Sequence, residues 1–148
     1  MTTFIGDITC KLDSKGRFLF PSTYKKQLTS SLKDSYVVKK DIFEKCLVLY
    51  QIDEWERQVD TIRSKLNPYN REHSKFLRGF YQNTAEVSLD GNNRILISKK
   101  LLNLIDAKKE LQLIGLDNKI EIWAKENYEK IEHNDDDFAQ LAEKILGE

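Results

Sequence analysis

The sequence predicts an α+β protein in which two pseudo-repeated half-units intertwine in one β-barrel, with connecting helices and a C-terminal helix. The first observation is a repeat, because residues 12–21, LDSKGRFLFP, return as residues 89–98, LDGNNRILIS. The second is that residues 46–50, CLVLY, match residues 119–123, KIEIW. Two copies are too few for a solenoid, in which stacked repeats bury a continuous core. They therefore predict two halves of one closed body.

The first repeat, residues 4–52, is expected to contain four strands and one short helix. The strands are predicted at residues 8–12, 17–20, 35–40 and 46–50. Ile8 and Cys10 alternate with polar residues, which is the pattern of a strand with one buried face. Pro21 ends the second strand, and Ser22 is expected to cap a helix that runs through Leu28.

A helical connection, residues 53–82, is expected between the repeats. Asp53 followed by Glu56 is typical of a helix start, in which the two side chains cap the first backbone amides. Asn67 and Pro68 are expected to end this helix, and Asn70 to cap a second one. The apolar face of the second helix is predicted to consist of Phe76, Leu77, Phe80 and Tyr81.

The second repeat, residues 83–125, is expected to follow the same plan. Its strands are predicted at residues 85–89, 94–97, 111–114 and 120–123, with Ser98 as the cap of a short helix. A helical tail, residues 126–148, differs from the first repeat. Residues 134–137 are expected to interrupt it, and the apolar spacing of Phe138, Leu141, Ala142 and Ile145 predicts a final amphipathic helix.

The two matching turns have a physical interpretation of their own. Each turn begins with an aspartate, Asp13 in the first repeat and Asp90 in the second. Aspartate accepts hydrogen bonds from the following backbone amides, and Gly16 or Asn93 tolerates a positive φ. A strand follows each turn, and so the turns present Arg17 and Arg94 at equivalent places.

Size and composition indicate one soluble globular domain. The chain has 148 residues, of which 40% are hydrophobic and 32% are charged, and this length is sufficient for one core. No apolar run reaches the roughly 20 residues of a membrane span. The start lacks the basic and apolar segments of a secretory signal, and we expect a cytoplasmic protein without a membrane partner.

The charge distribution is less neutral than the total of zero. Residues 1–40 carry eight lysines and arginines against three acidic residues, and residues 126–148 carry two against eight. Such asymmetry is consistent with a basic binding face and an acidic tail, although charged runs are more often solvated surface. Zero net charge argues against a protein that coats nucleic acid through bulk charge.

Catalysis and cofactor binding have little support in the sequence. His73 and His133 lie in polar helical segments without a nucleophile nearby, and surface positions are expected for both. Cys10 and Cys46 lie in strand patterns without metal-ligand spacing, which predicts reduced, buried thiols. Residues 135–137 lack the spaced ligands and glycine of a calcium loop. We therefore expect no enzyme, no cofactor, no metal and no small-molecule substrate.

The sequence resembles the MraZ family, whose members are built from two AbrB/SpoVT-type swapped-hairpin repeats. The resemblance rests on the paired D-x-x-x-R motifs and on Pro21 after the first motif, and it extends from about Phe4 to Tyr128. Further matching segments are residues 46–50, 53–56, 67–68 and 118–123. In the second motif, Asn93 stands where the family usually has glycine, and Asn92 occupies the position equivalent to Lys15.

The resemblance implies a sequence-specific regulator that binds double-stranded DNA at promoter repeats, associates with the nucleoid and forms a ring-like homo-oligomer. It also implies repression of the division and cell-wall gene cluster, including the protein's own gene. Carried over by position, the DNA-binding residues are Lys15, Arg17 and Arg94. Asp13, Gly16, Asp90 and Asn93 would support the motifs.

Two other interpretations remain open. Without the resemblance, Arg17 and Arg94 are better explained as ion-pair partners of Asp13 and Asp90 that hold the turns. The chain could also be a non-catalytic assembly module, in which the last helix recruits a protein partner. A hydrolase is a distant third interpretation.

Overall fold

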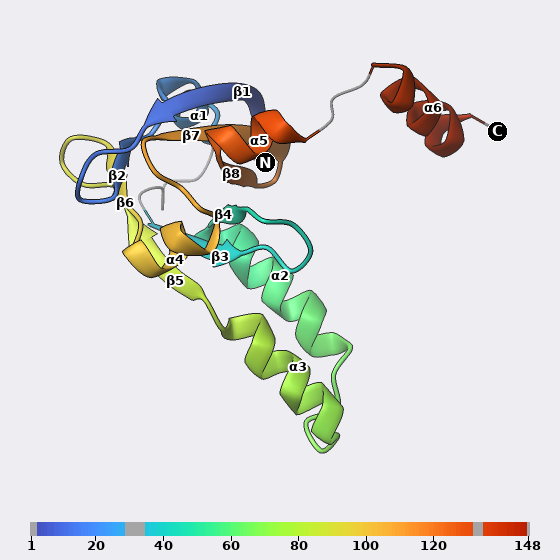
Figure 1. The fold of residues 1–148 in the computed structure, drawn as a ribbon. Helices are drawn as coiled ribbons and strands as arrows, with labels where there is room; N and C mark the ends of the chain where they lie inside the picture. The colour runs from blue at the N-terminus through green and yellow to red at the C-terminus, as the bar shows by residue number, and fades with distance from the viewer. Residues whose placement is uncertain (1–2, 29–34, 132–134, 148) are drawn as a thin grey trace.

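Two equivalent sets of strands and their helices make up the protein (Figure 1). The computed structural model describes residues 3–28, 35–131 and 135–147, which contain eight strands and six helices. The first set comprises β1 Phe4–Lys11, β2 Arg17–Leu19, α1 Ser22–Lys26, β3 Ser35–Lys40 and β4 Leu47–Gln51. The helices α2 Ile52–Ser64 and α3 Arg71–Tyr81 follow. The second set comprises β5 Thr84–Ser88, β6 Arg94–Leu96, α4 Lys99–Leu104, β7 Glu110–Asp117 and β8 Ile120–Ala124, before α5 Lys125–Lys130 and α6 Asp135–Leu146.

The strand order shows that the two sets exchange partners. Six strands form an antiparallel sheet in the order β1-β7-β8-β4-β3-β5, and β2 pairs with β6 in a separate two-stranded sheet. Edge strand β1 pairs with β7 of the second set, and edge strand β5 pairs with β3 of the first. Because β1 corresponds to β5 and β3 to β7, the order is the same when the two sets are interchanged. The topology therefore has an approximate two-fold symmetry.

The predicted α+β class and antiparallel strands are confirmed, but a single closed barrel is not. The six-stranded sheet is open, with β1 and β5 at its edges. Each edge strand leads through a turn into β2 or β6, and these three-residue strands pair with each other. Beyond the named strands, the described residues add only one isolated bridge, between Leu89 and Ile95. Backbone pairing therefore does not close the sheet.

One hydrophobic core joins the two sheets. Phe18 of β2 and Ile95 of β6 lie opposite each other and are at most 1% exposed. They belong to the same buried cluster as Leu49 of β4 and Leu113 of β7. Complete burial of such a side chain contributes roughly 1.5–3 kcal/mol. The short β2–β6 pair is therefore anchored by its inner face to the core of the larger sheet.

The connecting helices form a hairpin that extends from the sheet (Figure 1). The ring of Trp55 stacks on Phe80 at 5.5 Å with an interplanar angle of 5°, which ties α2 to α3. Asn70 caps α3 as predicted, because its side chain accepts hydrogen bonds from the amides of residues 72 and 73. The prediction that Asp53 caps α2 is wrong. β4 runs directly into the helix, so Gln51 takes the cap position and Asp53 lies in the first turn.

The short helices show the same mixture of outcomes. Ser98 caps α4 by accepting a hydrogen bond from the amide of Leu101, as predicted. Ser22 does not cap α1, because Pro21 occupies the cap position and Ser22 is already helical.

In the tail, residues 135–137 form the first turn of α6 rather than a break, and Asn134 lies outside the described residues. Within the described ranges, we find no helix with the length and apolar character needed to span a bilayer.

Candidate nucleic-acid interface

The turn between β1 and β2 is organised by one carboxylate. Asp13 Oδ1 accepts hydrogen bonds from the backbone amides of Lys15 at 3.0 Å and Arg17 at 2.8 Å. Asp13 Oδ2 accepts from Nε of Arg17 at 2.7 Å. The Gly16 amide donates to the carbonyl of Asp13 at 3.1 Å, which closes the turn. The hydrogen bond from the Arg17 backbone amide has the largest effect in lowering the pKa of Asp13 below its usual value.

The turn between β5 and β6 repeats this arrangement. Asp90 Oδ1 accepts from the amides of Asn92 at 2.8 Å and Arg94 at 2.9 Å, and Oδ2 accepts from Nε of Arg94 at 3.0 Å. The amide of Arg94 is also the main cause of a lowered pKa at Asp90. Asn93 has a φ of 60°, and its counterpart Gly16 has a φ of 88°. Both turns thus use a left-handed residue immediately before the arginine.

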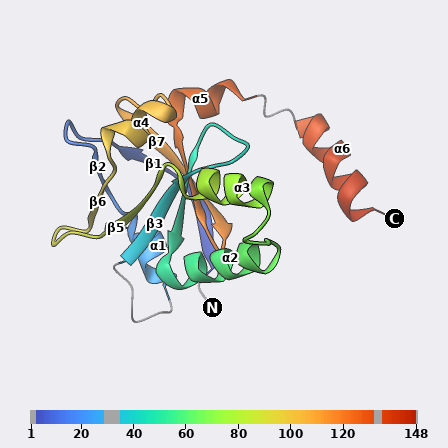
Figure 2. The same cartoon turned by 90° about the horizontal axis from the view of Figure 1, so that it is seen from below.

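The two turns are tied to each other through the backbone. The amide of Phe20 donates to the carbonyl of Asn93 at 2.8 Å, and the amide of Ile97 donates to the carbonyl of Gly16 at 2.9 Å. These bonds are equivalent under the approximate two-fold symmetry. They hold the two loops side by side at one end of the molecule, where both project from the body (Figures 1 and 2).

Each aspartate orients its arginine through one nitrogen only. In both Arg17 and Arg94, Nε donates to the aspartate. Among residues 3–28, 35–131 and 135–147, no acceptor lies within hydrogen-bond distance of the other two guanidinium nitrogens. The arginine side chains are 27% and 31% exposed. The Nη1 and Nη2 groups therefore remain available as a forked pair of donors, the geometry that matches a guanine edge or a phosphate.

The outer face of the β2–β6 pair carries two leucines between the arginines. Arg17 lies opposite Leu96, and Leu19 lies opposite Arg94. Since Phe18 and its partner point into the core, strand alternation places these four side chains on the outer face. Leu19 is 61% exposed and Leu96 is 54% exposed. We call this set of four residues the ribbon face.

The two loops differ in their neighbouring charges. Lys15 is exposed in the first loop, whereas Asn92 stands at the equivalent place in the second. A lysine from elsewhere compensates, because Nζ of Lys25 in α1 donates to Oδ1 of Asn93. Each loop therefore has one arginine and one nearby lysine.

Sequence reasoning missed Lys25 and the two leucines of the ribbon face. Lys25 has no counterpart in the repeat, since Leu102 occupies the matching position, and its partner is 68 residues away. Leu19 and Leu96 were detectable in principle, because each is two residues from its arginine and therefore shares its strand face.

The groups considered for catalysis or metal binding have structural explanations. Nδ1 of His73 accepts a hydrogen bond from the backbone amide of Asn67 at 2.8 Å, which stabilises the connection between α2 and α3. His133 lies outside the described residues. Both cysteines are free thiols; Cys46 is buried as expected, whereas Cys10 is only partly buried. Burial raises the pKa of Cys10 to about 11 and raises that of Cys46 further. Neither thiol is activated as a nucleophile.

Comparison with known proteins adds independent information. A family model described as "MraZ protein, putative antitoxin-like" matches residues 3–78 and 80–147. The transcriptional regulator MraZ of Bacteroides fragilis is 39% identical over 148 residues, which cover 100% of this chain and 94% of that protein. Its namesake in Flavobacterium psychrophilum is also 39% identical, covering 99% and 94%. The one in Clostridium tetani is 32% identical and covers 96% of each chain. The chain belongs to the MraZ family.

Proposed function

We propose that this chain is a sequence-specific transcriptional regulator that binds double-stranded DNA through the ribbon face and its two flanking loops. The observation that carries the proposal is the duplicated arginine whose Nε is held by an aspartate while its Nη donors remain available. A salt bridge alone would explain the pairing. It would not explain why both guanidinium groups are presented on one exposed ribbon with Leu19 and Leu96 between them.

The dimensions of the ribbon suit the major groove of DNA. A two-stranded ribbon can enter this groove, which is roughly 12 Å wide, and a three-residue strand rises about 10 Å. Arg17 and Arg94 would donate to guanine O6 and N7, while Leu19 and Leu96 would contact thymine methyl groups. Lys15 and Lys25 would bind phosphates beside the groove.

The aspartates support this role by fixing the arginines before DNA arrives. A carboxylate repels phosphate, so Asp13 and Asp90 are assigned to orientation rather than to contact. Holding each side chain in one geometry lowers the entropy lost on binding. Gly16 and Asn93 support the turns through their positive φ.

The proposed contact uses four cations of one subunit, Arg17, Arg94, Lys15 and Lys25, and the chain has zero net charge. Nonspecific attraction is therefore weak, and affinity must come from several subunits on repeated sites, since tethering raises effective concentration. A ring-like homo-oligomer on promoter repeats, associated with the nucleoid, satisfies this need. By family, its targets would be the division and cell-wall gene cluster, including its own gene, as a repressor.

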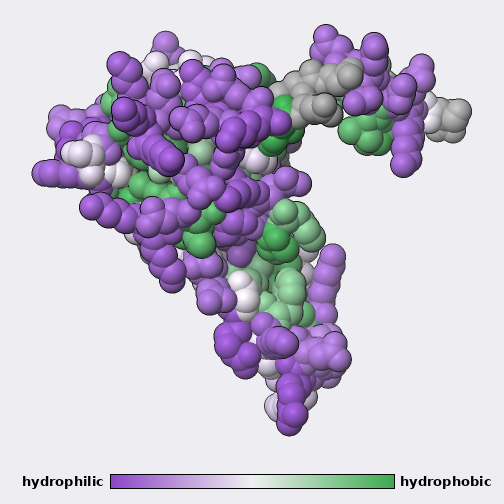
Figure 3. Space-filling view, viewed as in Figure 1, coloured by the Kyte–Doolittle hydropathy of each residue, from purple (hydrophilic) through white to green (hydrophobic). Residues whose placement is uncertain are grey.

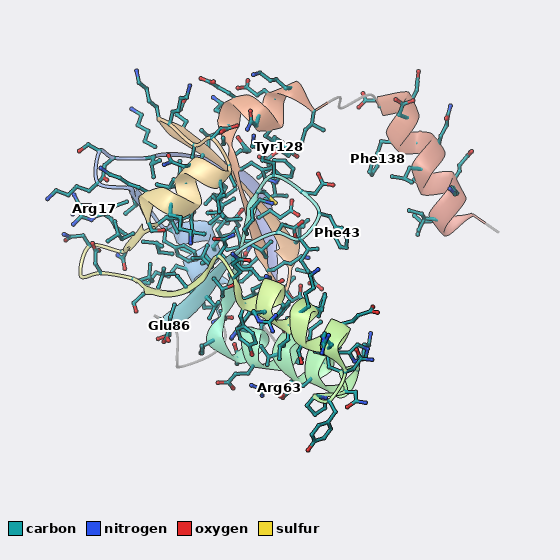
Figure 4. The ribbon with its side chains drawn as sticks, turned by 60° about the horizontal axis from the view of Figure 1, so that its bottom comes forward. Arg17, Phe43, Arg63, Glu86, Tyr128 and Phe138 are labelled. Atoms are coloured by element: carbon teal, nitrogen blue, oxygen red, sulfur yellow. The ribbon has the colours of Figure 1, made fainter. Side chains whose placement is uncertain are left out.

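Fluorescence anisotropy with duplexes tiled across the region upstream of the protein's own gene tests the proposal. Arg17→Ala and Arg94→Ala should each weaken specific binding roughly 10-fold or more, because a bidentate arginine contributes about 1–3 kcal/mol of discrimination. Arg63→Ala is the matched control, since Arg63 is exposed on α2 and lies away from Arg17 in Figure 4. Equal binding by wild type and the Arg17 variant would refute the assignment.

A non-catalytic assembly module is the second candidate, favoured by the exposed apolar side chains of α6. Deletion of residues 134–148 separates the two. A DNA-binding protein still binds a duplex after this deletion when binding is measured at low salt, where phosphate contacts are strong. An assembly module loses its protein partner and binds no duplex before or after the deletion.

A further inference from the structure

The last helix presents an apolar face that its own chain leaves uncovered. Phe138, Leu141 and Ile145 follow helical spacing along α6 and are 71%, 50% and 69% exposed. Figures 1 and 2 both show α6 standing apart from the rest of the molecule. Figure 3 shows the apolar side chains of α6 gathered on one side of the helix. A contiguous apolar face of this kind marks an interaction surface.

A groove that fits such a helix lies between α3 and the loop that joins β3 to β4. Its volume is about 680 Å³, and its apolar lining includes Ile42, Phe76, Gly79 and Phe80. Ile42 is 53% exposed and Phe76 is 44% exposed, so the apolar surface is open to a partner. Figure 3 shows apolar side chains in the region of the α2–α3 hairpin, and Figure 4 shows Phe43 on the adjoining loop. We call this the α3 groove.

Gly79 gives the α3 groove a place for close approach. A Cβ added at Gly79 would meet no atom within 4 Å, although glycine is unfavourable inside a helix. The position therefore exposes helix backbone in the lining of the groove. A second helix can come close there, as at other helix contacts formed by small residues, and Ala142 on the apolar side of α6 is small as well.

The charges of the two surfaces are complementary. The first turn of α6 consists of three aspartates, and Glu143 follows, against a single lysine, Lys144. Helix α3 carries Arg71, Lys75 and Arg78 against Glu72. The groove itself has a net charge of +1, because its lining includes Lys39, Lys40 and Lys75 against Asp41 and Glu72. Arg78 adds a further positive charge one turn later on α3. An acidic apolar helix and a basic apolar groove therefore attract each other through both charge and burial.

We propose that α6 of one copy docks into the α3 groove of a second copy. Each copy offers one helix and one groove at different places, so the contact is head-to-tail, and such contacts generate rings when the rotation closes. The inference deepens the proposed function, because it names the contact that links subunits of the DNA-binding ring. A second copy is favoured over the same chain because α6 lies apart from α3 of its own chain in both Figure 1 and Figure 2.

Light scattering coupled to size-exclusion chromatography of the full chain tests the contact. Leu141→Asp places a charge on the apolar face of α6. Gly79→Trp places an indole at the groove, at a position where the added Cβ meets no atom within 4 Å. Each variant alone should fall from the wild-type mass to the monomer mass. Gly79→Ala is the control and should keep the wild-type mass, because alanine favours the helix and is small.

Mixing the two variants gives a sharper result. The Gly79→Trp chain retains a good helix and the Leu141→Asp chain retains a good groove, so the mixture should form a heterodimer and stop there. If both variants keep the wild-type mass, or if wild type is monomeric at every concentration, the docking proposal is overturned. Anisotropy of wild type with a repeated-site duplex reports on DNA binding separately. Absence of that binding refutes the proposed function and leaves the docking result standing.

Discussion

Replacing Gly16 with alanine tests how the first turn is built. Gly16 has a φ of 88°, and a Cβ there would lie 2.6 Å from the carbonyl oxygen of Ile97 and 3.2 Å from Cδ1 of Leu102. The positive φ costs an alanine roughly 1–2 kcal/mol. Relief of the contact would also displace the hydrogen bond from the Ile97 amide to the Gly16 carbonyl, which contributes about 0.5–1.5 kcal/mol. Together the two contributions predict that Gly16→Ala lowers the free energy of unfolding by about 1.5–3.5 kcal/mol.

Urea unfolding followed by tryptophan fluorescence and circular dichroism, at one fixed protein concentration, measures this change. Gly91→Ala is the matched control, since a Cβ at Gly91 meets nothing within 4 Å and its φ is not positive. That variant should unfold within about 0.5 kcal/mol of wild type. Asn93→Ala should fall between the two, at about 1 kcal/mol, since asparagine visits a positive φ more readily than alanine. Equal stability of Gly16→Ala and Gly91→Ala would refute the reasoning.

Three further predictions concern charge and burial. The pKa values of Asp13 and Asp90 are lowered in the folded protein, and so both carboxylates stabilise the fold. This stabilisation is complete above the pKa of an ordinary carboxyl group, and it is lost as the pH falls through the pKa of the folded state. The double variant Asp13→Asn/Asp90→Asn should therefore lose less stability than wild type between about pH 5 and about pH 2 in urea titrations, and equal losses would contradict this. Because desolvation raises the pKa of both thiols, native protein should react slowly with a thiol-specific disulfide reagent, and both cysteines should react at once in denaturant. Cys46 should be the slower of the two in native protein, since it is buried and Cys10 is only partly buried; a fast Cys46 would contradict this. Lys25→Met should reduce the salt dependence of DNA binding by about one released counterion and leave urea stability within about 0.5 kcal/mol, whereas an unchanged salt slope would remove Lys25 from the interface.

The parts of the site that depend on local sequence were predictable. A turn that begins with aspartate and passes through glycine or asparagine is encoded within five residues, and its repetition at residues 90–94 identifies it. The places of Arg17 and Arg94 at the start of a strand follow from the same local pattern. Helix caps were predicted less well. Ser22 and Asp53 are residue types that often cap helices, but both lie inside the helix, because Pro21 takes the cap position of α1 and Gln51, the end of β4, takes that of α2.

The parts that depend on distant contacts were not predictable. The pairing of β1 with β7 brings together strands about a hundred residues apart, and no local pattern specifies it. The contribution of Lys25 to the second loop has the same origin, since only the tertiary fold carries α1 to Asn93. The sheet is open because β2 and β6 pair with each other in a separate sheet. Period-2 alternation identifies a strand but not the strand with which it pairs.

The palindromic strand order has a consequence for how the two halves can differ. Two identical halves on separate chains would satisfy the same pairings, and they would then be obliged to carry identical loops. When α2 and α3 join the two halves in one chain, each half is encoded separately, and the two loops can differ in sequence. Lys15 in one loop and Asn92 in the other show that the halves have used this freedom. The ribbon face thus has a direction, and a DNA site bound in the proposed way would need no dyad.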